Sequence, residues 1–246
     1  MGILNITPDS FSDGGKYFQI EDAIKHAKEL IKNGVDIIDI GGESTRPNAK
    51  PISEEEELKR VIPIIRKLSA AKFLISIDTY KSKVAQAALN AGANIINDIS
   101  GLTIDSNMVK VAAKYSCPIV IMHNMGIPAT KSEVTSLNII KEVYNWLLKR
   151  TNYAIKNGVK KENIIIDPGV GFGKTAKEDL ELIQSLKEFK PLGFPILIGP
   201  SRKSFIKKIF GEVDLEVKSR EMIQLAIKNG AAIVRVHEFM LSYSSY

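Results

Sequence analysis

The chain has 246 residues, 44% of them hydrophobic, and its 34 Lys and Arg against 28 Asp and Glu give a formal net charge of +6. This length, without any low-complexity segment, indicates a single globular domain over residues 1–246. There is no basic leader or long apolar run, so we expect no membrane segment, and the lone Cys117 excludes an internal disulfide and points to a reducing cytoplasm.

Short apolar runs alternate with helical patterns in the first half of the chain. Each run is followed by a polar residue, and each helical pattern has apolar residues on one face and a glycine near its end. Ser53 and Glu56 have the spacing of a capping box, and Pro63 should kink or break the helix that they start. We expect strands at 1–6, 35–40, 73–77 and 94–96, and helices at 21–33, from 53 onward and at 81–91.

The same rhythm continues in the second half. The sixth apolar run, IIID, has no polar alternation and reads as a strand buried on both faces, as in parallel sheets. We expect strands at 118–122, 164–167, 195–198 and 233–236, and helices at 108–115, 138–157, 176–187 and 217–229.

Eight strands alternating with helices predict an α/β fold of the (β/α)8 TIM barrel type, because a doubly wound sheet usually has five to seven strands. In such barrels the functional groups lie where the strands end. Only nine residues follow His237, too few for the eighth outer helix, so we expect that helix to be absent. The polar or functional residues at the predicted strand ends are Asn5, Asp39, Asp78, Asn97, Met122, Asp167, Lys203, Arg235 and His237.

The stretch 164–175, IIIDPGVGFGKT, has the density of glycines that suggests a phosphate loop. The Walker pattern would require glycine at Pro168, and a dinucleotide fingerprint from Gly169 would require Gly or Ala at Lys174. Nucleotide binding is therefore disfavoured. The alternative to a binding function is that the glycines serve only to turn the chain. Asp167 remains as a carboxylate at the end of a buried strand, where it needs donors.

We expect two carboxylates and an amide to meet at the barrel mouth, the end of the barrel where the strands finish. They belong to Asp78, Asn97 and Asp167. A carboxylate can accept two parallel N–H bonds from an aminopyrimidinone, so this set can read the edge of a flat heterocycle. Two alternatives stay open: internal salt bridges with Lys203 and Arg235, and a metal cluster that suits Mg²⁺ only loosely.

Cationic groups lie near the last two strand ends. Arg235 and His237 share a strand face and make an anion clamp, and Arg202 and Lys203 precede Ser204, which can begin a helix that favours an anion. The net positive charge also suits anionic small substrates, with a lysine-rich solvated surface as the alternative. A nucleic-acid surface is disfavoured for want of an aromatic platform. For His123, at another strand end, a functional role and a structural role both stay open.

Seven motifs in order, NITPDSFSDGG, IDIGGESTRP, SIDTY, NDISG, IIDPGVGFGKT, GPSRKSF and VRVH, closely resemble those of the dihydropteroate synthases, a pterin-binding family of folate biosynthesis. The resemblance covers nearly the whole chain. It implies condensation of 6-hydroxymethyl-7,8-dihydropterin diphosphate with p-aminobenzoate, release of pyrophosphate, a Mg²⁺ cofactor and sensitivity to sulfonamides as a drug class.

The resemblance also implies a role for each matching residue. The pterin would be held by Asp78, Asn97, Met122, Asp167, Lys203 and Arg235, and the diphosphate by Asn5, Arg235 and His237, with Asn5 binding the metal. The p-aminobenzoate site would be lined by Phe11, Thr45, Pro47 and Ser204. The residues implied in catalysis are Asp13, Lys203, Arg235 and His237.

The sequence departs from the family pattern in a few places. Asn48 replaces a glycine, Glu238 replaces an aspartate, and the family's N-terminal hairpin and last helix are both expected to be missing. Because family dimers pack through the last helices, we expect a homodimer for a full-length protein only. A pterin-binding methyltransferase and an inactive pterin-binding protein remain as alternatives.

Overall fold

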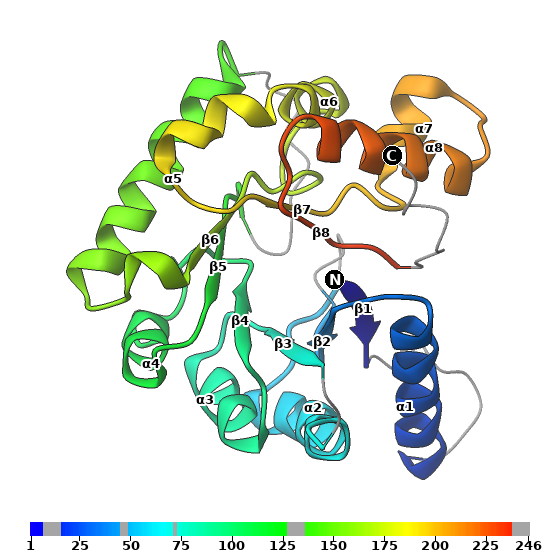
Figure 1. Ribbon diagram of the computed structural model, residues 1–246, viewed down its shortest axis with the longest axis vertical. Coiled ribbons are helices and arrows are strands. Elements are labelled where there is room, and N and C mark those ends of the chain that lie inside the picture. Colours follow the sequence, from blue (N-terminus) through cyan, green and yellow to red (C-terminus); the bar gives the residue numbers. More distant parts are fainter. Residues whose placement is uncertain (7–15, 45–48, 71–72, 127–135, 238–246) are drawn as a thin grey trace.

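The computed structural model describes residues 1–6, 16–44, 49–70, 73–126 and 136–237 (Figure 1). The side chains of residues 16–19 are also outside the description. The expectation about an eighth outer helix concerns residues 238–246, which lie outside the described ranges.

Eight short parallel strands form the centre of the molecule. Six of them pair in sequence order, and the last two pair with each other. The strands of the larger sheet are β1 (Gly2–Asn5), β2 (Ile37–Gly41), β3 (Leu74–Asp78), β4 (Ile95–Asp98), β5 (Ile119–Met122) and β6 (Ile164–Asp167), and the pair is β7 (Leu197–Ile198) and β8 (Ile233–Val234).

Isolated bridges join the two sheets at both edges. Ile166 pairs with Ile196, beside β7, and Gly2 pairs with Val236, just beyond β8. The second junction is reinforced by the Ile3 N–H, which donates to the Val236 carbonyl at 2.9 Å. The strands therefore close into a ring, and the predicted (β/α)8 barrel is confirmed.

Helices surround the strands on the outside (Figure 1). They bury apolar faces against the outward-pointing strand residues, Ile38, Ile40 and Ile77 among them. Helix and strand residues together form the larger core cluster. The helices are α1 (Lys16–Lys32), α2 (Glu54–Leu68), α3 (Ser82–Ala91), α4 (Met108–Tyr115), α5 (Ile139–Lys156), α6 (Ala176–Gln184), α7 (Ser204–Phe210) and α8 (Leu215–Lys228), with 3₁₀ turns at Lys161–Asn163 and Leu186–Leu192.

The predicted break of α2 at Pro63 is wrong, and a kink there stays a prediction. The helix continues from Glu54 to Leu68 with Pro63 inside it. Buried residues on both sides of the proline, Val61 and Ile64 among them, hold the helix to the core and outweigh the lost hydrogen bond.

Helix caps also differ in part from the sequence patterns. Ser53 caps α2 by accepting from the Glu56 N–H, but the Glu56 carboxylate binds Arg60 at 3.0 Å. The complete capping box belongs to α6, between Thr175 and Glu178. The predicted helix 176–187 ends at Gln184, where a 3₁₀ segment follows.

A second, smaller core cluster lies inside the barrel. It consists of Met1, Ile37, Ile95, Val120, Ile165 and Leu197, each from or next to a different strand. Because residues two apart share a strand face, the side chains two positions further along these strands project into the barrel mouth above this apolar layer. In the described part of the chain no helix is both long enough and apolar enough to cross a membrane.

Candidate active site

The barrel mouth gathers the polar residues predicted from the strand ends. Asp39, Asn97 and Asp167 follow the interior residues Ile37, Ile95 and Ile165 by two positions and therefore share their face. Arg235 follows Ile233 in the same way. The predicted grouping is thus a consequence of strand register, with the interior apolar layer as its floor.

Arg235 links three strands at this mouth. Its Nε donates to Asp39 Oδ2 at 2.6 Å, and its terminal Nη2 donates to Asp78 Oδ2 at 2.7 Å. The same Asp39 oxygen accepts from Asn97 Nδ2 at 3.0 Å. The salt-bridge alternative therefore describes part of this site, and Asp39 is its fully buried centre.

Asp39 is one of the predicted strand-end carboxylates, but the family resemblance assigns it no role in the site. Its other oxygen, Oδ1, is buried without a hydrogen-bond partner among the described residues. The signal that could have identified it is its place two residues after Ile37 in a fully buried strand.

The charges at the mouth perturb one another. Burial raises the pKa of Asp78 to about 7, although Arg235 opposes the shift. Burial disfavours the charge of Arg235, but Asp39 and Asp78 outweigh that effect and hold the pKa of the guanidinium above its ordinary value. Perturbed groups of this kind, clustered at one mouth, are typical of functional sites.

Asp167 lies at the end of β6, beside Met122 of β5, with which it is in register. Its Oδ1 accepts from the Gly169 N–H at 2.7 Å, and burial raises the pKa of the carboxyl to about 6. Gly169 has a φ of +72°, and a side-chain carbon there would lie 1.8 Å from the His123 carbonyl oxygen. Only glycine can therefore support Asp167 in this turn.

Lys203 approaches from the loop before α7. Its ammonium lies 4.4 Å from the centre of the Phe172 ring, and a side-chain carbon at Gly171 would lie 2.9 Å from Lys203 Cδ. Burial, and then the charge of Arg235, lower the pKa of Lys203 to about 8. The absence of a side chain at Gly171 thus leaves room for Lys203.

His237 and Ser201 meet beside β8. Ser201 Oγ lies 3.2 Å from His237 Nδ1, and Ser201 is buried. The sequence does not predict Ser201 as a site residue, because its partner is 36 positions away. α7 begins at Ser204, as predicted, and Ser204 is exposed.

Two further polar residues near the mouth, His123 and Lys174, contact other groups of the protein. His123 is buried edge-on to Trp146, with ring centroids 5.0 Å apart, and burial lowers its pKa to about 3. Lys174 donates to the Gly169 carbonyl at 2.8 Å and points to those of Phe172 and His123. Lys174 therefore ties the loops after β5 and β6 together.

Asn5 ends β1 near Asp78. A side-chain carbon at Gly41 would lie 3.5 Å from Asn5 Oδ1 and 3.6 Å from Asp78 Oδ2, so both oxygens border the same small space. Oxygen donors of this type suit Mg²⁺. No group of three or more His, Cys, Asp or Glu side chains in the described ranges is placed to hold a metal, so an ion here would require substrate and water oxygens as well.

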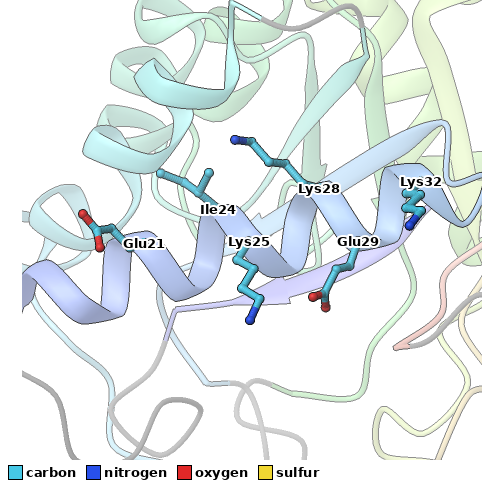
Figure 2. A pocket seen from close by; sticks show the side chains of 6 residues that line it. All are labelled: Glu21, Ile24, Lys25, Lys28, Glu29 and Lys32. Carbon is cyan, nitrogen blue, oxygen red and sulfur yellow. The ribbon is translucent and has the colours of Figure 1, made fainter.

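Four predicted site residues, Phe11, Asp13, Thr45 and Pro47, lie outside the described residues. A separate hollow runs along α1 and is lined by Glu21, Ile24, Lys25, Lys28, Glu29 and Lys32 (Figure 2). All six come from one outer helix, so this hollow belongs to the barrel wall and contributes nothing to the mouth.

Comparison with known proteins identifies the family of the chain. Residues 1–237 match the family described as pterin binding enzyme. Dihydropteroate synthase of Clostridium beijerinckii is 48% identical, over 98% of this chain and 88% of that protein.

Two solved structures have the same fold and related sequences. Dihydropteroate synthase of Xanthomonas albilineans with 4-aminobenzoic acid has a TM-score of 0.90 and 39% identity, covering 98% of this chain and 88% of that one. The enzyme of Anaplasma phagocytophilum with bound 6-hydroxymethylpterin-monophosphate has a TM-score of 0.89 and 39% identity, covering 98% and 94%. The chain therefore belongs to the pterin-binding enzyme family, among the dihydropteroate synthases.

Proposed function

We propose that the mouth described above condenses 6-hydroxymethyl-7,8-dihydropterin diphosphate with p-aminobenzoate, giving 7,8-dihydropteroate and pyrophosphate. The observation that carries this assignment is the pairing of buried carboxylates with Arg235 on one strand-end surface. Negative groups suit a heterocycle rich in N–H donors, and the guanidinium beside them suits a diphosphate. The wider proposal is a single-domain, cytoplasmic enzyme, with a homodimer proposed for a full-length protein only.

The pterin would lie over the interior apolar layer. Asp167 has one oxygen engaged by Gly169 and can offer the other to ring N–H groups, while Asn97 and Asp78 approach from β4 and β3. Met122 would pack against the ring, and Lys203 would donate to a ring acceptor. Related structures support this proposal through the pterin derivative bound by the Anaplasma phagocytophilum enzyme.

The diphosphate would lie toward β8 and β1, against Arg235, His237 and Asn5. Arg235 can shift from a carboxylate to a phosphate oxygen because its side chain keeps about a fifth of its surface exposed. Asn5 would hold Mg²⁺, which would neutralise charge on the diphosphate when bound.

The reaction requires no protein nucleophile. As the bond from the pterin methylene carbon to the diphosphate oxygen breaks, positive charge spreads into the pterin ring and negative charge collects on pyrophosphate. Fixed carboxylates near the ring and fixed cations near the leaving group both lower this barrier. The amine nitrogen of p-aminobenzoate then bonds to the methylene carbon and loses a proton to solvent.

The second substrate would be held by loops at the mouth. Phe11, Thr45, Pro47 and Ser204 are the proposed p-aminobenzoate contacts, and Asp13, Lys203, Arg235 and His237 are the proposed catalytic residues. The 4-aminobenzoic acid in the Xanthomonas albilineans structure supports this choice of substrate.

The test combines binding with turnover. Calorimetry should show binding of the pterin diphosphate, and addition of p-aminobenzoate with Mg²⁺ should release pyrophosphate and form dihydropteroate. Binding without pyrophosphate release would instead indicate a pterin-binding protein without this activity. Methyl transfer from a methyl-pterin donor, without use of p-aminobenzoate, would indicate the methyltransferase alternative.

A further inference from the structure

Lys174, the lysine of the glycine-rich stretch 164–175, has no part in the proposed reaction, yet its side chain is buried. Lys174 is only 6% exposed. Within the described ranges its ammonium donates to backbone carbonyl oxygens and forms no ion pair. A buried cation without a paired carboxylate is costly, so its place in the loop calls for a reason.

The ammonium of Lys174 has three N–H donors, and three carbonyl oxygens converge on it. Those of Gly169 and Phe172 belong to the loop after β6 and lie 2.8 and 3.4 Å from Nζ. That of His123, directly after β5, lies 3.5 Å from Nζ. Lys174 therefore occupies the inside of the loop after β6 and joins this loop to the end of the neighbouring strand.

The loop after β6 depends on such contacts, because glycines give it little rigidity of its own. Gly169, Gly171 and Gly173 all have positive φ. Glycine also loses more conformational freedom on folding than any other residue. A second contact comes from α6, where the buried Asp179 accepts through Oδ1 from the Gly171 N–H at 2.7 Å. The shape of the loop is thus held by side chains that bind its backbone groups.

The shape of this loop reaches the proposed pterin site through Gly169. Its N–H donates to Asp167 Oδ1 at 2.7 Å, and its carbonyl is the nearest contact of the Lys174 ammonium. One glycine therefore contacts the pterin carboxylate on one side and the buried lysine on the other.

Lys174 also acts on Asp167 through its charge. Burial raises the pKa of Asp167 to about 6, and the cations that oppose this shift are Lys203, Lys174 and Arg235. Burial lowers the pKa of Lys174 in turn, against the charges of Asp179 and Asp167. Geometry and charge therefore connect the same two side chains.

We propose that Lys174 is a positioning residue for the pterin: by holding the Gly169 carbonyl, it keeps the Gly169 N–H on Asp167 and leaves the second oxygen of that carboxylate for the ligand. This inference rests on the proposed function, in which Asp167 binds the pterin ring. It gives the lysine of the glycine-rich stretch a role in heterocycle binding, where the sequence pattern alone suggested a phosphate.

The test compares Lys174→Met with a matched variant, Lys177→Met. Lys177 is exposed in the first turn of α6 and lies three positions from Lys174. In calorimetry with 6-hydroxymethyl-7,8-dihydropterin diphosphate at pH 7.5, we expect the Kd of Lys174→Met to rise about tenfold or more. Lys177→Met should keep the Kd of the parent within about twofold.

The pH dependence of binding is the second measurement, because a merely structural lysine would not change the titration of Asp167. Loss of the Lys174 charge removes one of the cations that keep this carboxyl ionised, so its pKa should rise above about 6. More of the carboxyl is then protonated at pH 6. The ratio of the Kd at pH 6 to the Kd at pH 7.5 should therefore be larger for Lys174→Met than for the parent or Lys177→Met.

A gentler substitution covers the case in which Lys174→Met does not fold, as judged by circular dichroism. The amide of Lys174→Gln can still donate to a carbonyl but has no charge, so its Kd at pH 7.5 should rise by a smaller factor, with the same change in the Kd ratio. An unchanged Kd in folded Lys174→Met, or a raised Kd with the ratio of the parent, overturns the positioning role. Failure of the parent to bind the pterin diphosphate overturns the proposed function, and this inference with it.

Discussion

Asp39 and Arg235 are 196 positions apart in the chain, yet the Arg235 Nε donates to Asp39 Oδ2 at 2.6 Å. Asp39 is fully buried and also receives a hydrogen bond from Asn97. One carboxylate therefore orients both a proposed pterin contact and a proposed diphosphate contact.

Asp39→Ala should destabilise the protein strongly. It leaves the guanidinium Nε and the Asn97 amide without their acceptor in a buried place, for which we expect a loss of about 3–5 kcal/mol in the free energy of unfolding. Denaturant titration measures this loss. Asp36→Ala, at an exposed position before the same strand, should change it by less than about 0.5 kcal/mol; equal effects of the two substitutions would contradict the central place of Asp39.

Asp167→Asn should abolish pterin binding while the fold remains. The amide oxygen can still accept from Gly169, but the amide nitrogen then presents a donor to the donors of the ligand. The expected loss in affinity is about a hundredfold or more, measured by calorimetry with the pterin diphosphate. Pterin affinity equal to that of the parent would show that Asp167 lies elsewhere than in the pterin site.

Pterin affinity should depend on pH through Asp167, Asp78 and Lys203. The pKa of Asp167 is raised to about 6 and that of Asp78 to about 7, so at lower pH these carboxyls are protonated and are poor acceptors; affinity should rise as pH increases through 6 to 7. The pKa of Lys203 is lowered to about 8, so above that pH its charge is lost and affinity should decline. Calorimetry from pH 5 to pH 9 should show a maximum between about 7 and 8.

The alkaline decline has its own control. Lys203→Met has no titrating group at this position, so its weaker binding should show no decline between pH 7 and pH 9 while the acidic limb persists. A decline of the same size in this variant would assign the alkaline limb to another group.

Gly169→Ala should be far more costly than Gly211→Ala. Both glycines have positive φ, +72° and +74°, and Gly211, with a ψ of −150°, lies in a region essentially restricted to glycine, so backbone strain costs an alanine about 1–3 kcal/mol. Only at Gly169 does the added carbon meet backbone, the His123 carbonyl oxygen at 1.8 Å; at Gly211 nothing lies within 4 Å. We expect the free energy of unfolding to fall by more than about 3 kcal/mol for Gly169→Ala, with weakened pterin binding, because Gly169 also holds Asp167. Equal losses at both positions would mean that the chain relaxes around residue 169.

Local signals in the sequence determined the strands, most helix ends and the strand-end residues. Met108–Tyr115 is helical as predicted, and α3 ends at Gly92 with a φ of +113°, because apolar spacing and glycine act over a few neighbouring residues. Pro63 shows the limit of such signals, because α2 continues through it with buried residues on either side.

Tertiary structure alone decided which polar groups meet. Arg235 forms ion pairs with Asp39 and Asp78. Ser201 Oγ lies within hydrogen-bond distance of His237. Lys81 donates to both Glu43 and the Ile52 carbonyl. Barrel closure places β8 beside β1 and so brings residues from both ends of the chain to one mouth. The sequence determined that charged residues would stand at the strand ends, and the closed ring of strands determined their partners, because a buried charge must be paired with whatever group the fold brings within reach.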